Sequence, residues 1–516
     1  MIKNIRLILL SLVLVGSSSC KGFLDEYPDS AIPEEMAMET LDDCTTIVTG
    51  IYSAFKSGYL YSGSMTLLPD IQADMAYASD ANMGVYTEFY RWQFKPTNAD
   101  VQGVYASLYS IVSTCNFFIE NIEKVQSKLT SDAEKEELER RLGDVYFARA
   151  LAYAELIRFY CEAYDEDIAD KEEMGVSLKL SYADASPVKR STLRESYAQV
   201  ISDLEFAEKY IPSSRSVADS PYFSIGAVNA LRSRIYLYMG GTGNTPDAEA
   251  EKKNLEKCIE YAGKVINSDI YELCNGTTGS GSDYEKIWSF DTGSEVIWKV
   301  AMSSTSLGSS LGKIFLNFVA PDYYNPDYVF AEEIRKLFYE GDCRSSLFVT
   351  DYTVGTGHDQ PMVIKYFGNT NLDGGATKKF INMPKVFRLS EVYLLRAEAY
   401  YKLGLEEEAN ADITAIRKKR ITSYGSSGAS GDDLFKEIQN ERAIELYMEG
   451  FRLSDLKRWK LPIQRKKQIY TVDGPDNNEL NIPYNSTKYC LTTWPIPKHE
   501  LEATDGVVKG NASNDL

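Results

Sequence analysis

The sequence predicts a mainly α-helical protein in which pairs of helices stack side by side, with a loop-rich segment in the middle of the chain. Apolar residues recur three and four positions apart on both sides of residues 271–385, which is the period of an amphipathic helix. Two of these helical stretches open with a Ser/Thr-x-x-Glu capping box, a common helix start. Residues 271–385 are instead rich in Gly, Ser, Thr, Asp and Tyr, which indicates loops, small hairpins and a few short strands.

The individual helices follow from these patterns. A helix is predicted over 103–125, where apolar residues share one face. Two more are predicted to begin at the capping boxes Ser131–Glu134 and Thr192–Glu195. Helical periodicity returns over 387–419.

One segment shows how the helices are paired. AEAYYKLGLEEEA, residues 397–409, holds an aromatic pair, then Gly404, then Ala409. The glycine permits a tight turn and the alanine lets two helices approach closely, as in a tetratricopeptide-type helix pair. YAELIRFY and RSRIYLYMGG with KCIEYAGKVI are looser versions. Such pairs stack into an α-solenoid, because each buries its apolar face on its neighbours.

Composition excludes several classes of function. The 516 residues carry a formal charge of −20, which argues against binding DNA, RNA or an anionic membrane surface. Only 2 histidines are present, and no H-E-x-x-H, G-x-S-x-G or Walker A pattern occurs. We therefore expect no enzymatic activity, no metal and no cofactor. The 36 tyrosines are rings suited to sugar or peptide surfaces.

The N-terminus is predicted to be a targeting segment. Residues 1–19 have two basic residues, a short apolar run and small residues before Cys20, the layout of a lipoprotein signal peptide. Cys20 is the expected lipidated residue and residues 20–40 the tether; an ordinary signal peptide with an incidental Cys20 is the alternative. Residues 41–516 are expected to form one domain, with parts 41–270, 271–385 and 386–516.

The stretch IQNERAIELYMEGFRLSDLKRWK mixes acidic, basic and apolar residues. Arg442 lies three positions before Glu445, and Arg452 three after Glu449, so these charges are expected to pair along a helix. Gly450 is placed to end or bend the first of two helices. Alternating charges remove the basic stripe that nucleic acid needs. The stretch is therefore predicted to be structural and not an active site.

Several motifs in order resemble one family. They are CKGFLDEYP, RALAYAELIRFY, SPVKRSTLRESYAQVISDLEFAEKYIP, NPDYVFAEEIRKLFYEGDCR, LLRAEAYYKLG, NERAIELYMEGFRLSDLKRW and WPIPKHE. Together they are similar to the SusD/RagB family of outer-membrane nutrient-binding lipoproteins, over essentially the whole mature chain. RKKR at 417–420, Ala443 and the C-terminal VVKGNASNDL depart from the usual pattern of that family.

The resemblance implies a non-catalytic function. Members are anchored by lipid in the outer leaflet, face the cell exterior, and cover a SusC-like TonB-dependent transporter. They capture a glycan for import, while helix pairs supply the scaffold and loops supply the ligand site. Capture of a peptide by the same system and a protein-interaction scaffold with no small ligand remain as alternatives.

The ligand site is predicted from aromatic rings beside planar polar groups, because flat rings stack on sugar rings and polar groups reach the hydroxyls. One window, residues 74–94, lacks helical periodicity, and a second lies at APDYYNPDYVF. The alternative is that these rings belong to the core. The candidates are Tyr77, Asp80, Asn82, Tyr86, Tyr90, Arg91 and Trp92 from the first window, Tyr323 and Tyr324 from the second, and Trp288. Trp92 and Tyr90 are the first choices.

Overall fold

The computed structural model describes residues 37–516 apart from 244, 246, 247, 321, 322, 374–378, 470 and 472–478. The predicted signal peptide over 1–19, the lipidation of Cys20 and nearly all of the predicted tether therefore lie outside the described residues. Within the part that is described, no helix is long and apolar enough to cross a bilayer.

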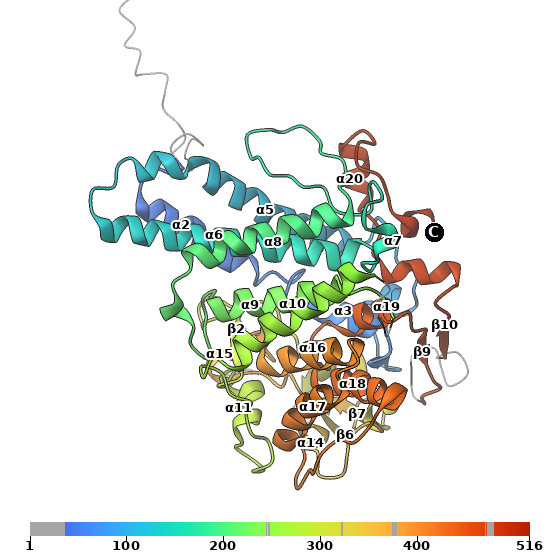
Figure 1. The fold of residues 1–516 in the computed structure, drawn as a ribbon. Coiled ribbons are helices and arrows are strands. Elements are labelled where there is room, and N and C mark those ends of the chain that lie inside the picture. Colours follow the sequence, from blue (N-terminus) through green and yellow to red (C-terminus); the bar gives the residue numbers. More distant parts are fainter. Residues whose placement is uncertain are drawn as a thin grey trace, which may run out of the picture.

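The long helices form one continuous stack, which confirms the mainly α-helical fold (Figure 1). They are α2 (Leu41–Ala54), α5 (Ala99–Gln126), α6 (Asp132–Tyr160), α8 (Leu193–Tyr210), α9 (Ile225–Tyr238), α10 (Glu249–Ile266), α16 (Leu389–Lys402), α17 (Glu406–Arg420) and α18 (Gly431–Glu445). From α5 to α10, each helix packs on the next. Although the loop-rich segment separates α10 from α16 in the chain, α16 packs directly on α10 and continues the stack through α17 and α18.

Both predicted capping boxes are present. At the start of α6, the Ser131 hydroxyl accepts from the Glu134 N–H at 3.3 Å, and the Glu134 carboxylate accepts from the Ser131 N–H at 3.2 Å. At the start of α8, Thr192 and Glu195 exchange the same bonds at 3.1 and 2.9 Å. These local bonds satisfy backbone donors that a helix start leaves unpaired.

The helix pair α16–α17 has the predicted turn. Gly404 adopts a φ of 75°, a left-handed conformation that glycine takes without a Cβ penalty. Its N–H donates to the Tyr401 carbonyl at 2.9 Å, which closes α16. Ala409 is fully buried in the hydrophobic core, as close packing of the pair requires.

Short helices and two-stranded antiparallel sheets occupy the loop-rich segment, as the sequence predicted, and others lie outside it. The sheets pair β1 (Ala76–Ala78) with β5 (Tyr328–Phe330), β2 (Val296–Lys299) with β8 (Lys385–Arg388), β3 (Phe318–Ala320) with β4 (Tyr323–Tyr324), β6 (Val349–Thr353) with β7 (Asp359–Val363), and β9 (Ile463–Arg465) with β10 (Leu480–Ile482). The shorter helices are α3 (Ser64–Gln72), α4 (Thr87–Tyr90), α7 (Glu166–Ala169), α11 (Asp283–Ser289), α12 (Lys313–Leu316), α13 (Glu332–Arg335), α14 (Arg344–Leu347), α15 (Thr370–Asp373), α19 (Arg452–Arg458) and α20 (Lys498–Ala503), with 3-10 turns η2 (Ser213–Arg215), η3 (Thr487–Thr492) and η4 (Ala512–Asp515).

The stretch around α18 and α19 is structural. Asp455 pairs with Arg458, three positions on, at 2.9 Å, but the pairs expected for Arg442 and Arg452 were wrong. Arg442 binds Asp455 at 2.9 Å instead of Glu445. Arg452 binds Asp74 at 2.7 Å instead of Glu449. Arg442 and Glu445 both lie in α18, but Glu445 is bound by other arginines. For Arg452 the reason is that α18 ends at Glu445, so helical spacing does not continue from Glu449 through the turn at Gly450.

Glu445 instead joins a fully buried network of arginines. Its carboxylate lies 2.8 Å from Arg388, 2.9 Å from Arg420 and 3.0 Å from Arg344. Burial alone would raise the pKa of Glu445, but the attraction of these guanidinium groups outweighs it and lowers the pKa well below its usual value. The Glu445 carboxylate therefore has a structural role, because it links the elements that carry these arginines.

Candidate functional site

The pairing of β1 with β5 brings the two predicted ligand windows together. Ala78 lies opposite Tyr328 in the sheet register. Just beyond the strands, the Ser79 N–H donates to the Asp327 carbonyl at 2.9 Å, and the Ser79 hydroxyl donates to the Pro326 carbonyl. Segments about 250 positions apart in the chain therefore form one surface.

The turn of the β6–β7 hairpin adds a third segment. The Tyr323 hydroxyl donates to the Gly355 carbonyl at 3.0 Å, and the Gly355 N–H donates to the Tyr324 carbonyl at 2.9 Å. On the other side, the Thr356 hydroxyl donates to the Asp80 carboxylate at 3.3 Å. We call residues 79–86, 323–327 and 354–358 the three-loop surface.

Asn82 and Asp327 hold the first loop in place. The Asn82 amide donates to the Asp327 carbonyl at 3.1 Å and accepts from the Gly84 N–H at 2.8 Å. The Asp327 carboxylate accepts from the Met83 N–H at 3.3 Å. Burial raises the pKa of Asp327. Asn82, a predicted ligand residue, is therefore engaged in shaping the loop.

The groups left accessible on the three-loop surface suit a polar ligand with flat apolar faces. Tyr323 is 45% exposed and Met83 is 84% exposed, while Asp80 and Thr356 are also exposed. A tyrosine ring offers a stacking face, and a carboxylate and a hydroxyl supply hydrogen-bonding groups. Because backbone bonds fix the loops, little ordering is needed on binding.

Trp92 and Tyr90, the first choices from sequence, lie in the core. Trp92 is 2% exposed, and its indole N–H donates to the Gln72 carbonyl at 2.8 Å. The Tyr90 ring meets Tyr328 edge-on with centroids 5.9 Å apart, and the Arg465 guanidinium covers it at 3.9 Å. Neither ring presents a face at the surface in this structure.

The remaining predicted residues of these windows are buried or half-buried. Tyr77 is buried and its hydroxyl donates to the Lys466 carbonyl. Tyr324 is buried under Tyr352. The half-buried Tyr86 approaches Ser64, and burial raises the pKa of its hydroxyl to about 12. Arg91 is half-buried, and its carbonyl accepts from Lys488 at 3.4 Å.

Trp288 is enclosed by cations away from the three-loop surface. The Lys365 ammonium lies 4.0 Å, the Lys385 ammonium 4.7 Å and the Arg388 guanidinium 5.1 Å from its ring. These contacts are cation–π interactions within the core. Of the predicted residues, Asp80, Asn82 and Tyr323 are thus brought together at one accessible place.

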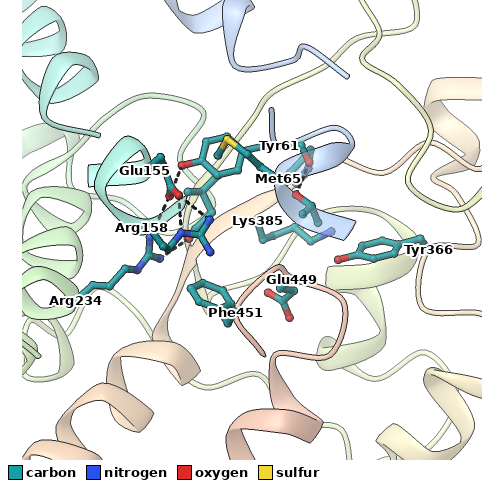
Figure 2. Close-up of a pocket in the computed structure, with 12 residues that line it drawn as sticks. Tyr61, Met65, Glu155, Arg158, Arg234, Tyr366, Lys385, Glu449 and Phe451 are labelled. Carbon is teal, nitrogen blue, oxygen red and sulfur yellow. Dashed lines mark hydrogen bonds and ion pairs between the residues drawn. The ribbon is translucent and has the colours of Figure 1, made fainter. Parts of the chain in front are cut away.

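A cavity lined in part by residues of α6 and α9 contains many charges, and these have partners within the protein (Figure 2). The Glu155 carboxylate accepts from the Tyr61 hydroxyl at 3.0 Å and from Arg158 at 2.6 Å, and Arg234 binds Glu391 at 2.7 Å. The volume of about 20 Å³ holds about one water molecule. This cavity is an internal polar junction, too small for a nutrient.

Sequence reasoning missed the hairpin turn at Gly355 and Thr356. A signal for it was present: VTDYT and DQPMV flank VGTGH, and two strand-like runs around a glycine-containing turn predict a hairpin. What the sequence did not indicate is that this turn contacts Asp80 and Tyr323.

Comparisons with known proteins agree with this architecture. A model of the SusD family matches residues 355–513, and a model described as starch-binding associating with outer membrane matches residues 22–237. A SusD-like protein of Formosa agariphila is 22% identical, over 96% of this chain and 96% of its own length.

Solved structures share the fold along nearly the whole chain. A SusD superfamily protein from Bacteroides thetaiotaomicron has a TM-score of 0.74 and 24% identity, and covers 92% of this chain and 99% of its own. A putative sugar binding protein from Bacteroides vulgatus has a TM-score of 0.73 and 22% identity, with the same coverage. With both ends of the chain matched by family models and the fold shared between them, the chain belongs to the SusD family.

Proposed function

We propose that this protein binds a glycan at the three-loop surface and holds it for import through a partner TonB-dependent transporter. The observation that carries the proposal is the placement of Tyr323 and Asp80 on one accessible surface, with Gly355 and Thr356 bonded to them. The family, one of whose matching models describes starch-binding proteins associating with the outer membrane, supports the ligand class and the location.

The mode of action follows from the groups at the surface. The Tyr323 ring stacks on a sugar ring, and Asp80 accepts hydrogen bonds from its hydroxyls. The protein performs no chemistry on the glycan. An acyl chain on Cys20 keeps it on the outer leaflet facing the exterior, where a captured glycan is close to the transporter.

The test is retardation of the purified chain in native gels that contain single polysaccharides: amylopectin, laminarin, xylan, pectin or galactomannan. We expect one polymer to retard the wild type. Tyr323→Ala and Asp80→Ala should each weaken binding about tenfold, equivalent to about 1.4 kcal/mol. Tyr222→Ala removes a tyrosine that is 55% exposed outside the three-loop surface, and it should bind as the wild type does.

The possible outcomes test the location of the site and the class of ligand separately. Wild-type retardation of a Tyr323→Ala, Asp80→Ala double variant would reject the three-loop surface as the site. If no polymer retards the wild type, glycan capture is rejected. The wild type and the same variants should then be tested against a peptide library.

A further inference from the structure

An open cleft lies between α5 and the start of α20, away from the three-loop surface. Its volume is about 370 Å³, within the range of small-molecule sites. Both helices lie in the upper part of Figure 1. In contrast to the one-water cavity of Figure 2, this cleft has room for a ligand.

One stripe of α5 forms a wall of the cleft. Gln102, Tyr105, Ala106 and Tyr109 line it and fall at positions i, i+3, i+4 and i+7, which share one helix face. The Tyr105 and Tyr109 rings contact each other with centroids 4.7 Å apart. The Tyr109 hydroxyl donates to the Ser177 carbonyl at 3.0 Å, which fixes the ring.

Tyr59 adds a third ring, positioned by a glycine of the same helix. A Cβ on Gly103 would lie 2.4 Å from the Tyr59 ring, so the ring rests directly on the helix backbone. Tyr59 is nevertheless 42% exposed. The cleft therefore has rings held in place by packing and by a backbone bond.

Three polar side chains reach the cleft with unused hydrogen-bonding capacity. Gln102, His499 and Glu500 line it, and among the described residues none of their side chains has a hydrogen-bond or ion-pair partner. Glu500 is half-buried, and burial raises the pKa of its carboxyl. A carboxylate that loses water without gaining a partner is costly, so a ligand that donates hydrogen bonds would be favoured here.

We propose that this cleft is a second saccharide-binding site, which takes one sugar ring between Tyr109 of α5, backed by the buried Tyr105, and Tyr59. Sugar hydroxyls donate to Glu500 and accept from the Gln102 amide, while the C–H faces of the ring pack on tyrosine. An apolar ligand would leave all three polar groups unpaired, and a cation would leave the Gln102 donors unpaired. The proposal rests on the proposed function only for the class of ligand.

The test uses saturation-transfer NMR of the purified chain with four probes: the methyl glycosides of glucose, galactose, mannose and xylose. We expect transfer to at least one probe. Ala106→Phe places a ring in the cleft from an exposed helix position and should abolish that transfer. Glu500→Gln should reduce it at least threefold. Glu502→Gln, which changes the same chemical group on α20 outside the cleft, should leave it unchanged.

Tyr323→Ala separates this proposal from the previous one, because it changes only the three-loop surface. Transfer that survives in Tyr323→Ala and is lost in Ala106→Phe supports the cleft. Transfer that is lost in Tyr323→Ala and unchanged in Ala106→Phe, or no transfer to any probe, would overturn it. Polysaccharide retardation that depends on Tyr323 would leave the proposed function standing even then.

Discussion

Trp92 and Tyr323 both carry large aromatic rings, but their surroundings give them opposite roles. Trp92 follows α4 with a φ of 56°, and its buried indole N–H donates to the Gln72 carbonyl. Tyr323 keeps a ring at the surface while its hydroxyl is anchored to Gly355. A hydrogen bond to the polar group of an aromatic side chain therefore does not show whether the ring is buried or available to a ligand. The exposure of the ring itself decides this.

At the residue scale, Trp92→Ala should destabilise the fold. The change leaves a cavity and an unpaired buried carbonyl, so we expect the free energy of unfolding to fall by about 3–5 kcal/mol. Denaturant unfolding followed by circular dichroism measures this. Tyr323→Ala is the matched control and should cost less than about 1 kcal/mol. Equal stability of the two variants would contradict the burial of Trp92.

Asp70 should make stability depend on pH. It is fully buried, and its carboxylate accepts from the Gly450 N–H at 3.3 Å and the Arg452 N–H at 3.0 Å. Burial raises its pKa from 3.8 to about 7. Between these values the folded state holds a proton that the unfolded chain releases, so this contribution to stability is lost as the pH rises.

The measurement is the free energy of unfolding at several pH values for the wild type and Asp70→Asn. At about 1.4 kcal/mol per pH unit, the wild type should lose up to roughly 4 kcal/mol relative to the variant between pH 4 and pH 7. Curves that stay parallel over this range would show that Asp70 ionises normally in the folded state.

At the element scale, the buried glutamate of α18 joins helices that are distant in the chain. Arg388 precedes α16, Arg420 ends α17 and Arg344 begins α14, and all three bind Glu445. A carboxylate at this position satisfies three buried cations at once. If this carboxylate is removed, the three buried guanidinium groups have less negative charge near them and no water to solvate them.

Glu445→Gln should therefore cost about 3–5 kcal/mol of unfolding free energy. The matched change is Glu260→Gln on α10, where the 2.8 Å pair with Lys264 is exposed to solvent. That change should cost less than about 1 kcal/mol. Thermal and denaturant unfolding of both variants give the comparison, and a loss at Glu445 as small as that at Glu260 would refute the importance of the network.

At the scale of the whole molecule, the first third and the last residues of the described chain share one core. The Gln72 amide donates to the Leu491 carbonyl at 2.9 Å, and its oxygen accepts from the Trp494 indole at 3.0 Å. The Trp494 backbone N–H donates to the Phe159 carbonyl at 2.8 Å. The C-terminal segment is thus packed against α3 and α6 of the first third.

A chain that ends at Lys488 should fold poorly, because it lacks the fully buried Trp494 and the buried Leu491. We expect the thermal midpoint to fall strongly or the cooperative transition to vanish in circular dichroism. Deletion of the exposed Asp515 and Leu516 is the control and should leave the midpoint close to that of the full chain. A full-length midpoint in the chain ending at Lys488 would show that this segment adds nothing to the core.

The sequence by itself determined several of the long helices, the capping boxes of α6 and α8 and the turn at Gly404, because each depends on residues within a few positions of one another. It also indicated the family through motifs in order along the chain. Only the tertiary structure decided that Trp92 is covered while Tyr323 is open, that Arg442 binds Asp455, and that Asp80 lies beside Thr356. Burial and charge pairing depend on residues up to hundreds of positions apart, and no local period encodes which of them meet.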